Sequence, residues 1–205
     1  MKIAIIGTGN VGGSLTKGWA KAGHEILLGV RDLEDDKVKE LADFHENISI
    51  HSVREASQKA EVILLAAIPQ ATKEIADSIG DVSEKILIDA MNSIGKKPEP
   101  YAHTFDALKA WTNAKAIVKC FNSTGFENML KPVYDGTGID MFMAGNSEKG
   151  KKIAKQLALD LGFSDCYDFG GDDKVQLLEQ FALAWINLAI MQGQGRGIAF
   201  KVLKR

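Results

Sequence analysis

The sequence predicts a doubly wound α/β fold built around a mostly parallel sheet. Three observations favour this fold class. Short apolar runs alternate with longer segments of helical period, and the first run ends in a glycine-rich turn. The runs at residues 3–6 and 62–67 also lack alternating polar residues, as is typical of strands buried on both faces. Strands separated by helices imply β-α-β units with helices on both faces of the sheet.

Each predicted strand is a short, mainly apolar run, and each predicted helix repeats its apolar positions every three or four residues. Strands are expected at residues 3–6, 25–30, 48–51, 62–67, 86–88, 115–119 and 140–144. Helices are expected at residues 11–22, 34–44, 70–79, 104–111, 148–161 and 172–192. We therefore expect a sheet domain over residues 1–171 and a short C-terminal helical segment over residues 172–205.

Composition excludes several classes of function. The chain has 205 residues, 45% of them hydrophobic, and a net charge of -2, which leaves no basic excess for binding nucleic acid. The longest apolar stretch, residues 181–191, is too short to span a membrane. Two cysteines outside any CxxC pattern, with no leader-like start, predict a reducing, cytoplasmic location and no cysteine-built metal site.

A glycine-rich turn follows the first predicted strand and opens a helix. Its sequence, Gly7-Thr8-Gly9-Asn10-Val11-Gly12, matches the pattern G-x-G-x-x-G. Gly7 permits a tight turn, Gly9 lets the backbone approach a pyrophosphate, and Gly12 lets the helix pack closely on the strand. The helix N-terminus offers free amides and a positive dipole end to phosphates. We predict that this segment binds a dinucleotide, in a domain of Rossmann type.

The end of the second strand indicates which dinucleotide is bound. Arg31 lies near the position where NAD-dependent enzymes place an acidic residue for the ribose 2′-hydroxyl. A guanidinium can instead hold a 2′-phosphate through forked hydrogen bonds, and Lys37 adds a further positive charge. We therefore predict NADP(H), with Val30, Arg31 and Lys37 near the phosphate. In the alternative interpretation Arg31 is a solvated turn residue and Asp32 binds NAD.

Further site residues are expected where later strands end, because ligands of open α/β sheets bind outside the carboxyl ends of the strands. Ala67, Ile68 and Pro69 are predicted beside the nicotinamide or its ribose. Pro69 would equally serve as the first residue of a helix. Asn92 and Asn122 follow the next two strands and could bond the carboxamide or the ribose.

No recognised arrangement for acid–base or nucleophilic catalysis occurs in the chain. The four histidines are scattered, and His103, in the long loop before residue 104, is the one expected nearest a ligand. Lys119 is expected to end its strand in solvent, although a proton-donor role is the alternative. Cys120 is expected to be a small buried apolar residue. No catalytic residue is therefore named.

The chain resembles a known family over nearly its whole length. The segments that carry the resemblance are the glycine turn, Gly29-Val30-Arg31, Ala66-Ala67-Ile68-Pro69, Ile88-Asp89-Ala90-Met91-Asn92, Val118-Lys119-Cys120-Phe121-Asn122-Ser123, and Gly162-Phe163 through Asp168-Phe169-Gly170-Gly171 to Leu178-Glu179. Together they resemble the coenzyme F420-dependent NADP oxidoreductases, which share their fold with the reductase domain of the six-transmembrane metalloreductases. Val30 stands where members of the family often have serine.

The resemblance implies reversible hydride transfer between NADP(H) and a deazaflavin, coenzyme F420, or a flavin, FMN or FAD. Such a reaction needs the protein mainly to stack two rings and exclude water. Two alternatives stay open. One is an imine or ketone reductase resembling pyrroline-5-carboxylate reductase, for whose longer helical domain only about 34 residues follow Gly171. The other is a module that senses NADP(H) without turnover.

The last predicted helix is apolar on more than one side. One stripe comprises Leu177, Phe181, Ala184, Trp185 and Leu188, and it is widened by Leu178, Ala182 and Ala189. A helix that is apolar nearly all round needs burial on more than one side. It is either a core helix on the sheet or, as we expect, the interface of a homodimer that also covers the flavin site.

Overall fold

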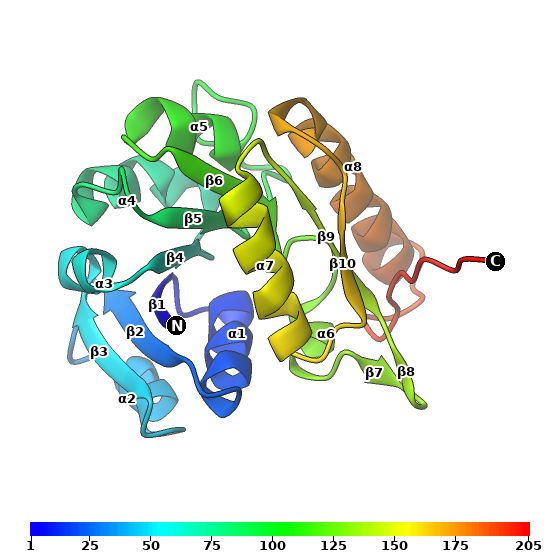
Figure 1. The fold of residues 1–205 in the computed structure, drawn as a ribbon, viewed down its shortest axis with the longest axis horizontal. Helices are drawn as coiled ribbons and strands as arrows, with labels where there is room; N and C mark the ends of the chain where they lie inside the picture. The colour runs from blue at the N-terminus through cyan, green and yellow to red at the C-terminus, as the bar shows by residue number, and fades with distance from the viewer.

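The computed structural model describes residues 1–205, and its centre is one eight-stranded sheet (Figure 1). The strand order is β10-β9-β6-β5-β4-β1-β2-β3. The strands are β1 (Lys2–Ile6), β2 (Glu25–Val30), β3 (Ile48–Ser52), β4 (Val62–Leu65), β5 (Ile86–Asp89), β6 (Ala116–Cys120), β9 (Asp140–Ala144) and β10 (Asp165–Asp168). A separate hairpin joins β7 (Val133–Tyr134) and β8 (Thr137–Gly138).

The sheet is mostly parallel, as the sequence predicts. Strands β1 to β6 pair in parallel, whereas β9 runs antiparallel to β6 and carries β10 beside it. The register places Ile6 opposite both Gly29 of β2 and Leu65 of β4. The chain leaves β1 toward β2 on one side and reaches β4 on the other, so the strand order reverses at β1. Ligands of this fold class bind in the crevice at that point.

Helices cover both faces of the sheet (Figure 1). One face carries α1 (Asn10–Lys21), α2 (Asp36–Ala42), α6 (Phe126–Leu130) and α7 (Glu148–Asp160). The other carries α3 (Val53–Lys59), α4 (Thr72–Ile79), α5 (Thr104–Trp111) and α8 (Val175–Ile186). Short 3-10 turns at Pro69–Ala71 and Asp172–Lys174 precede α4 and α8, and a π-helical turn at Asn187–Met191 extends α8. No helix has the length and apolar character needed to cross a membrane.

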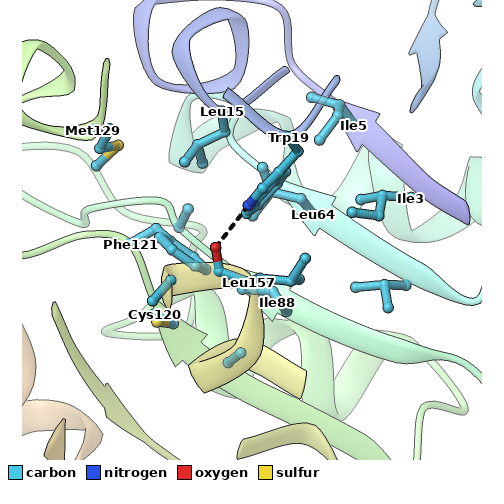
Figure 2. Close-up of a cluster of buried hydrophobic side chains, with 14 of the residues drawn as sticks. Ile3, Ile5, Leu15, Trp19, Leu64, Ile88, Cys120, Phe121, Met129 and Leu157 are labelled. Carbon is cyan, nitrogen blue, oxygen red and sulfur yellow. Dashed lines mark hydrogen bonds between the residues drawn. The ribbon is translucent and has the colours of Figure 1, made fainter. Parts of the chain in front are cut away.

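Each face has its own hydrophobic core, and the larger one surrounds Trp19 (Figure 2). The Trp19 indole packs edge to face against Phe121, with ring centroids 5.4 Å apart. Its Nε1 donates to the Leu157 carbonyl at 2.9 Å, which satisfies the one polar atom of the buried ring. Trp19 therefore joins α1, the end of β6 and α7, so the helix that begins at the glycine turn is held rigidly on the sheet.

The predicted elements are confirmed with three kinds of difference. Strands β7, β8 and β10 and helices α3 and α6 were not predicted. Helix α3 begins immediately after β3 at a capping box in which the Ser52 side chain accepts from the Glu55 amide and the Glu55 side chain accepts from Ser52. Strand β4 ends at Leu65 rather than Ala67, and the helix predicted over 172–192 begins at Val175 after its 3-10 turn.

The last helix is held against β9 by the C-terminal tail. Trp185 Nε1 donates to the Ile198 carbonyl at 2.7 Å, and the Arg196 guanidinium lies over the rings of both Phe126 and Trp185. The predicted apolar stripe is therefore divided: Trp185, Leu178, Ala182 and Ala189 are buried, whereas Leu177, Ala184 and Leu188 are exposed. The buried half packs on the sheet, and the exposed half has no partner within the chain.

Candidate functional site

The glycine turn lies at the carboxyl end of β1, and the three glycines occupy three different environments. Gly7 has a φ of +102°, and a Cβ there would come within 2.6 Å of the Ala66 carbonyl oxygen. At Gly12 a Cβ would lie 1.8 Å from the Gly7 carbonyl oxygen. At Gly9, by contrast, a Cβ would meet no atom within 4 Å, so the backbone there is open to an approaching group. Tight turn, open approach and close helix packing are the requirements of a pyrophosphate cradle.

The N-terminus of α1 faces the same turn and carries no internal anion. Gly9 is its N-cap without a side-chain bond, and no acidic residue lies in the first turn. The first backbone bond of the helix runs from the Gly13 amide to the Gly9 carbonyl at 2.7 Å. The amides of Asn10 and Val11 therefore precede the intrahelical bonds, and together with the helix dipole they can bind a phosphate.

A cavity of about 570 Å³ opens beside the turn, between β1, β2 and α4. Six of the predicted site residues line it: Gly7, Thr8, Val30, Arg31, Ala67 and Ile68. Gly29 also lines it, and the absence of a side chain there lets Ile6 and Ala56 pack against the backbone of β2. Lys37 does not line the cavity; it is exposed in the first turn of α2.

The segment after β4 leads from this cavity toward the neighbouring strand ends. Ile68 is 62% exposed although it is a large apolar side chain. Pro69 is buried and is the first residue of the 3-10 turn, a position for which its fixed φ and missing amide suit it. Its helix-starting role is therefore confirmed, and the exposed apolar surface of Ile68 is available to a planar ring.

Asn92 and Asn122 meet beyond the ends of β5 and β6. The Asn92 amide donates to the Asn122 backbone carbonyl at 2.9 Å, and the Asn122 amide donates to the Asn92 side-chain oxygen at 3.1 Å. The preceding Phe121 holds a left-handed φ of 61°, which turns the chain so that Phe121 packs on Trp19 (Figure 2). The side-chain oxygen of Asn122 is buried without a hydrogen-bond partner, so this pair retains one free acceptor.

Lys119 is the expectation that the structure overturns. It does not end its strand in solvent; it is 0% exposed, next to an equally buried Asp89. Its Nζ lies 3.1 Å from Asp89 Oδ2 and 2.6 Å from Glu179 Oε1, and it donates to the Met91 carbonyl. A buried ammonium needs such partners because loss of hydration is costly. We name the side chains of Asp89, Lys119 and Glu179 the buried charge cluster.

The buried charge cluster joins four elements at the carboxyl edge of the sheet. Asp89 is the last residue of β5, Lys119 lies in β6, and Glu179 belongs to α8. Thr104, the first residue of α5, donates to Asp89 Oδ2 at 2.6 Å. Burial raises the pKa of Asp89, against the opposing effect of Lys119. Burial alone would lower the pKa of Lys119, but the two carboxylates outweigh it and hold that pKa above its ordinary value. Lys119 is therefore a fully buried ammonium group whose partners are the carboxylates of Asp89 and Glu179.

Three acidic partners were not anticipated: Asp89 and Glu179 in the buried charge cluster, and Glu74, which lines the cavity with its Oε1 atom 3.6 Å from Arg31 Nη1. Charged residues of opposite sign within two otherwise apolar strands were the available signal for Asp89 and Lys119, since neighbouring buried strands bring such residues together. Glu179 and Glu74 had no comparable signal. His103, the histidine expected nearest a ligand, is the half-buried N-cap residue of α5, and its Nδ1 has no partner. Cys120 is buried and free, as expected.

The reversal of strand order at β1, the glycine turn and the open cavity define the class of protein: an α/β protein of the Rossmann type. The sequence model of the family described as "NADP oxidoreductase coenzyme F420-dependent" matches residues 2–93. This match covers less than half of the chain, and over these residues the expected resemblance to the coenzyme F420-dependent NADP oxidoreductases is found. The matching family model is described as one of NADP oxidoreductases, and the chain is similar to it.

Similarity to individual proteins extends over nearly the whole chain. It is 29% identical to an F420-dependent NADP reductase of Methanothermobacter thermautotrophicus over 210 residues, covering 93% of this chain and 90% of that protein. A second F420-dependent NADP reductase, from Methanothermobacter marburgensis, is 28% identical and covers 93% of each chain.

Solved structures share the fold. A crystal structure of a candidate F420-dependent NADP reductase from Arthrobacter sp. FB24 superposes with a TM-score of 0.86 at 24% identity, covering all of both chains. The reductive aminase of Aspergillus terreus in complex with NADPH reaches a TM-score of 0.69 at 16% identity, covering 94% of this chain and 62% of that one. At these identities the likeness concerns the fold alone.

Proposed function

We propose that this protein transfers a hydride between NADP(H) and a second ring cofactor, either the deazaflavin coenzyme F420 or a flavin, FMN or FAD. The observation that carries the proposal is the glycine turn. Of its three glycines, only Gly9 has open space where a Cβ would lie, and Gly9 is the N-cap of α1, next to the free amides of that helix. The names of the two Methanothermobacter relatives support coenzyme F420 as the second cofactor.

Each part of the dinucleotide has residues that fit it. The turn from Gly7 to Gly12 would hold the pyrophosphate, and Val30 and Arg31, with Lys37 beyond the cavity, would face the 2′-phosphate. Ala67, Ile68 and Pro69 would border the nicotinamide ring. The free acceptor of Asn122 suits the amide group of a nicotinamide carboxamide, with Asn92 holding Asn122 in place. When bound, the dinucleotide supplies the hydride, and these residues orient it and exclude water.

Rapid mixing of NADPH-loaded protein with coenzyme F420, FMN or FAD tests the proposal. We expect the NADPH absorbance to fall as one of the acceptors is reduced within a single turnover, because adjacent stacked rings need no further catalytic group. Transfer to none of the three would contradict an oxidoreductase acting on these cofactors. Tight NADPH binding without transfer would instead favour the sensing module, and oxidation of NADPH by a cyclic imine such as pyrroline-5-carboxylate would favour the imine reductase.

We further propose that residues 172–205 form a separate helical segment next to the sheet domain of residues 1–171, and that this segment mediates a homodimer. The exposed half of the last helix supports this, because Leu177, Leu188 and Met191 are 55%, 40% and 64% exposed. A contiguous apolar stripe of this kind is typical of an interaction surface. The cytoplasmic location stays an expectation from the sequence.

Sedimentation velocity tests the dimer. We expect the wild-type chain to sediment as a dimer and Leu188→Lys to sediment as a monomer, since a lysine at the centre of the stripe would have to bury its charge. Gln180→Lys is the matched control, because Gln180 is an exposed polar residue of the same helix. A monomeric wild type, or a variant that sediments like the wild type, would contradict the assignment of this stripe.

A further inference from the structure

We propose that Glu74 competes with the cofactor's 2′-phosphate for Arg31, and so reduces the preference of the site for NADP(H) over NAD(H). This inference rests on the proposed dinucleotide function. It identifies a residue that determines specificity and that belongs to neither the glycine turn nor the end of β2.

Glu74 lies across the cavity from Arg31. Arg31 follows β2, whereas Glu74 belongs to the first turn of α4, and both line the same cavity of about 570 Å³. The Arg31 Nη1 atom is 3.6 Å from Glu74 Oε1. The guanidinium that the sequence assigns to a phosphate therefore already has a carboxylate partner contributed by a different element.

The other two carboxylates of the cavity differ from Glu74 because they are bonded within their own loop. Asp32 Oδ1 accepts from the Glu34 amide at 2.9 Å, and Asp35 Oδ1 accepts from the Lys37 amide at 2.8 Å. Both carboxylates thus hold the turn that leads into α2. Glu74 is the acidic residue of the cavity that is paired with Arg31.

The exposure of the pair decides how it acts. The side chains of Arg31 and Glu74 are 81% and 57% exposed, so their ion pair contributes little to stability and opens readily. A phosphate dianion can therefore take over the guanidinium, but the Glu74 carboxylate then lies next to it and repels it. NAD(H) carries a neutral 2′-hydroxyl at that place and meets no such repulsion. The repulsion by Glu74 therefore weakens the binding of NADP(H) and not that of NAD(H).

Glu74→Gln in the full-length chain tests the inference by calorimetric titration with NADP⁺ and NAD⁺. We expect NADP⁺ to bind about three- to fivefold more tightly, the scale of an exposed charge pair, and NAD⁺ to bind unchanged. Added salt should shrink the gain, because exposed charges are screened. Titration with 2′,5′-ADP and 5′-AMP repeats the comparison on the adenosine half alone.

Asp77→Asn is the matched control. Asp77 lies one turn further along α4, is 60% exposed, pairs with Lys73 and does not line the cavity. It removes the same charge from the same helix and should leave both affinities unchanged. Arg31→Ala provides the opposite effect, weakening NADP⁺ much more than NAD⁺. Glu74→Ala also removes the charge but introduces no amide, so its affinities show whether the effect of Glu74→Gln comes from the lost charge or from a new contact of the glutamine. Thermal melting checks that each variant is folded.

The possible results are distinct. Unchanged NADP⁺ affinity in Glu74→Gln and Glu74→Ala, an equal gain for both cofactors, an equal gain in Asp77→Asn, or weaker binding of either cofactor would each overturn the inference. Wild-type protein that binds neither cofactor would instead contradict the proposed function. If the wild type binds both and Arg31→Ala discriminates between them while Glu74→Gln does not, only the role of Glu74 fails.

Discussion

Lys119→Met is expected to destabilise the protein by about 3–5 kcal/mol, because it leaves the two carboxylates of the buried charge cluster without a cation. Asp89 and Lys119 are 0% exposed and Glu179 is 5% exposed, so water cannot replace the lost ammonium. Urea unfolding of the variant and the wild type measures the difference. Since Glu179 belongs to α8, we also expect that helix to lose protection in amide hydrogen exchange.

The destabilisation by Lys119→Met should decrease as the pH falls. Burial already raises the pKa of Asp89, and removal of Lys119 raises it further. A carboxyl group whose pKa is higher in the folded state binds its proton more readily there, so the folded state gains stability as the pH falls. The destabilisation by Lys119→Met should therefore be smaller at about pH 5 than at about pH 8.

Two controls separate the buried charge cluster from a general effect of losing a lysine. Lys115→Met removes an exposed lysine next to the same strand, whose partner Glu84 is also exposed, and should change stability little. Combining Lys119→Met with Asp89→Asn and Glu179→Gln should recover part of the stability, because no uncompensated charge remains. If Lys119→Met were as stable as Lys115→Met at neutral pH, the buried charge cluster would not contribute to the stability of the fold.

Gly12→Ala is expected to destabilise the fold by roughly 3 kcal/mol and to abolish dinucleotide binding, because overpacking against rigid backbone forces the chain to move. The added Cβ would lie 1.8 Å from the Gly7 carbonyl oxygen, so α1 must shift away from β1. That shift displaces the helix amides from the turn. Thermal unfolding and NADPH titration measure the two consequences separately.

The neighbouring glycines provide the comparison. At Gly13 a Cβ would lie 3.7 Å from the Thr8 carbonyl oxygen, an ordinary contact, so Gly13→Ala should be neutral or stabilising in this helix. At Gly9 a Cβ meets nothing in the protein, so Gly9→Ala should keep wild-type stability yet bind NADPH about tenfold more weakly. Wild-type affinity in Gly9→Ala would contradict the placement of the pyrophosphate at this turn.

Much of the fold could be predicted because its signals are local. Strand β9 at Asp140–Ala144 and helix α5 at Thr104–Trp111 have the predicted bounds, and β1 begins one residue earlier. In each, apolar spacing and length distinguish strand from helix within the segment itself. Helix α3 was missed because its seven residues begin directly after β3 and leave no connecting loop as a signal. The two-residue strands β7 and β8 are too short to show any period.

The backbone features of the candidate site could be predicted for the same reason, because they depend on local sequence. The glycine turn follows from backbone sterics at single residues, so the tight turn at Gly7 and the close packing at Gly12 could be predicted from the sequence. The strand ends carrying Ala67, Asn92 and Asn122 follow from the rule that parallel strands present their carboxyl ends at one edge. Lys37 shows the limit, because the start of α2 decides where its side chain lies relative to the cavity.

The chain order of strands and helices, the mostly parallel sheet and the glycine turn are thus properties of the amino-acid sequence alone, since each depends on residues a few positions apart. Tertiary structure alone decided that Lys119 is buried between Asp89 and Glu179, that Glu74 faces Arg31, and that half of the last helix stays exposed. The ion pairs join residues 30 to 60 positions apart in the chain, whose charges meet only after the sheet has assembled. Local spacing carries no information about such partners, because burial of a charge depends on which distant group arrives to compensate it.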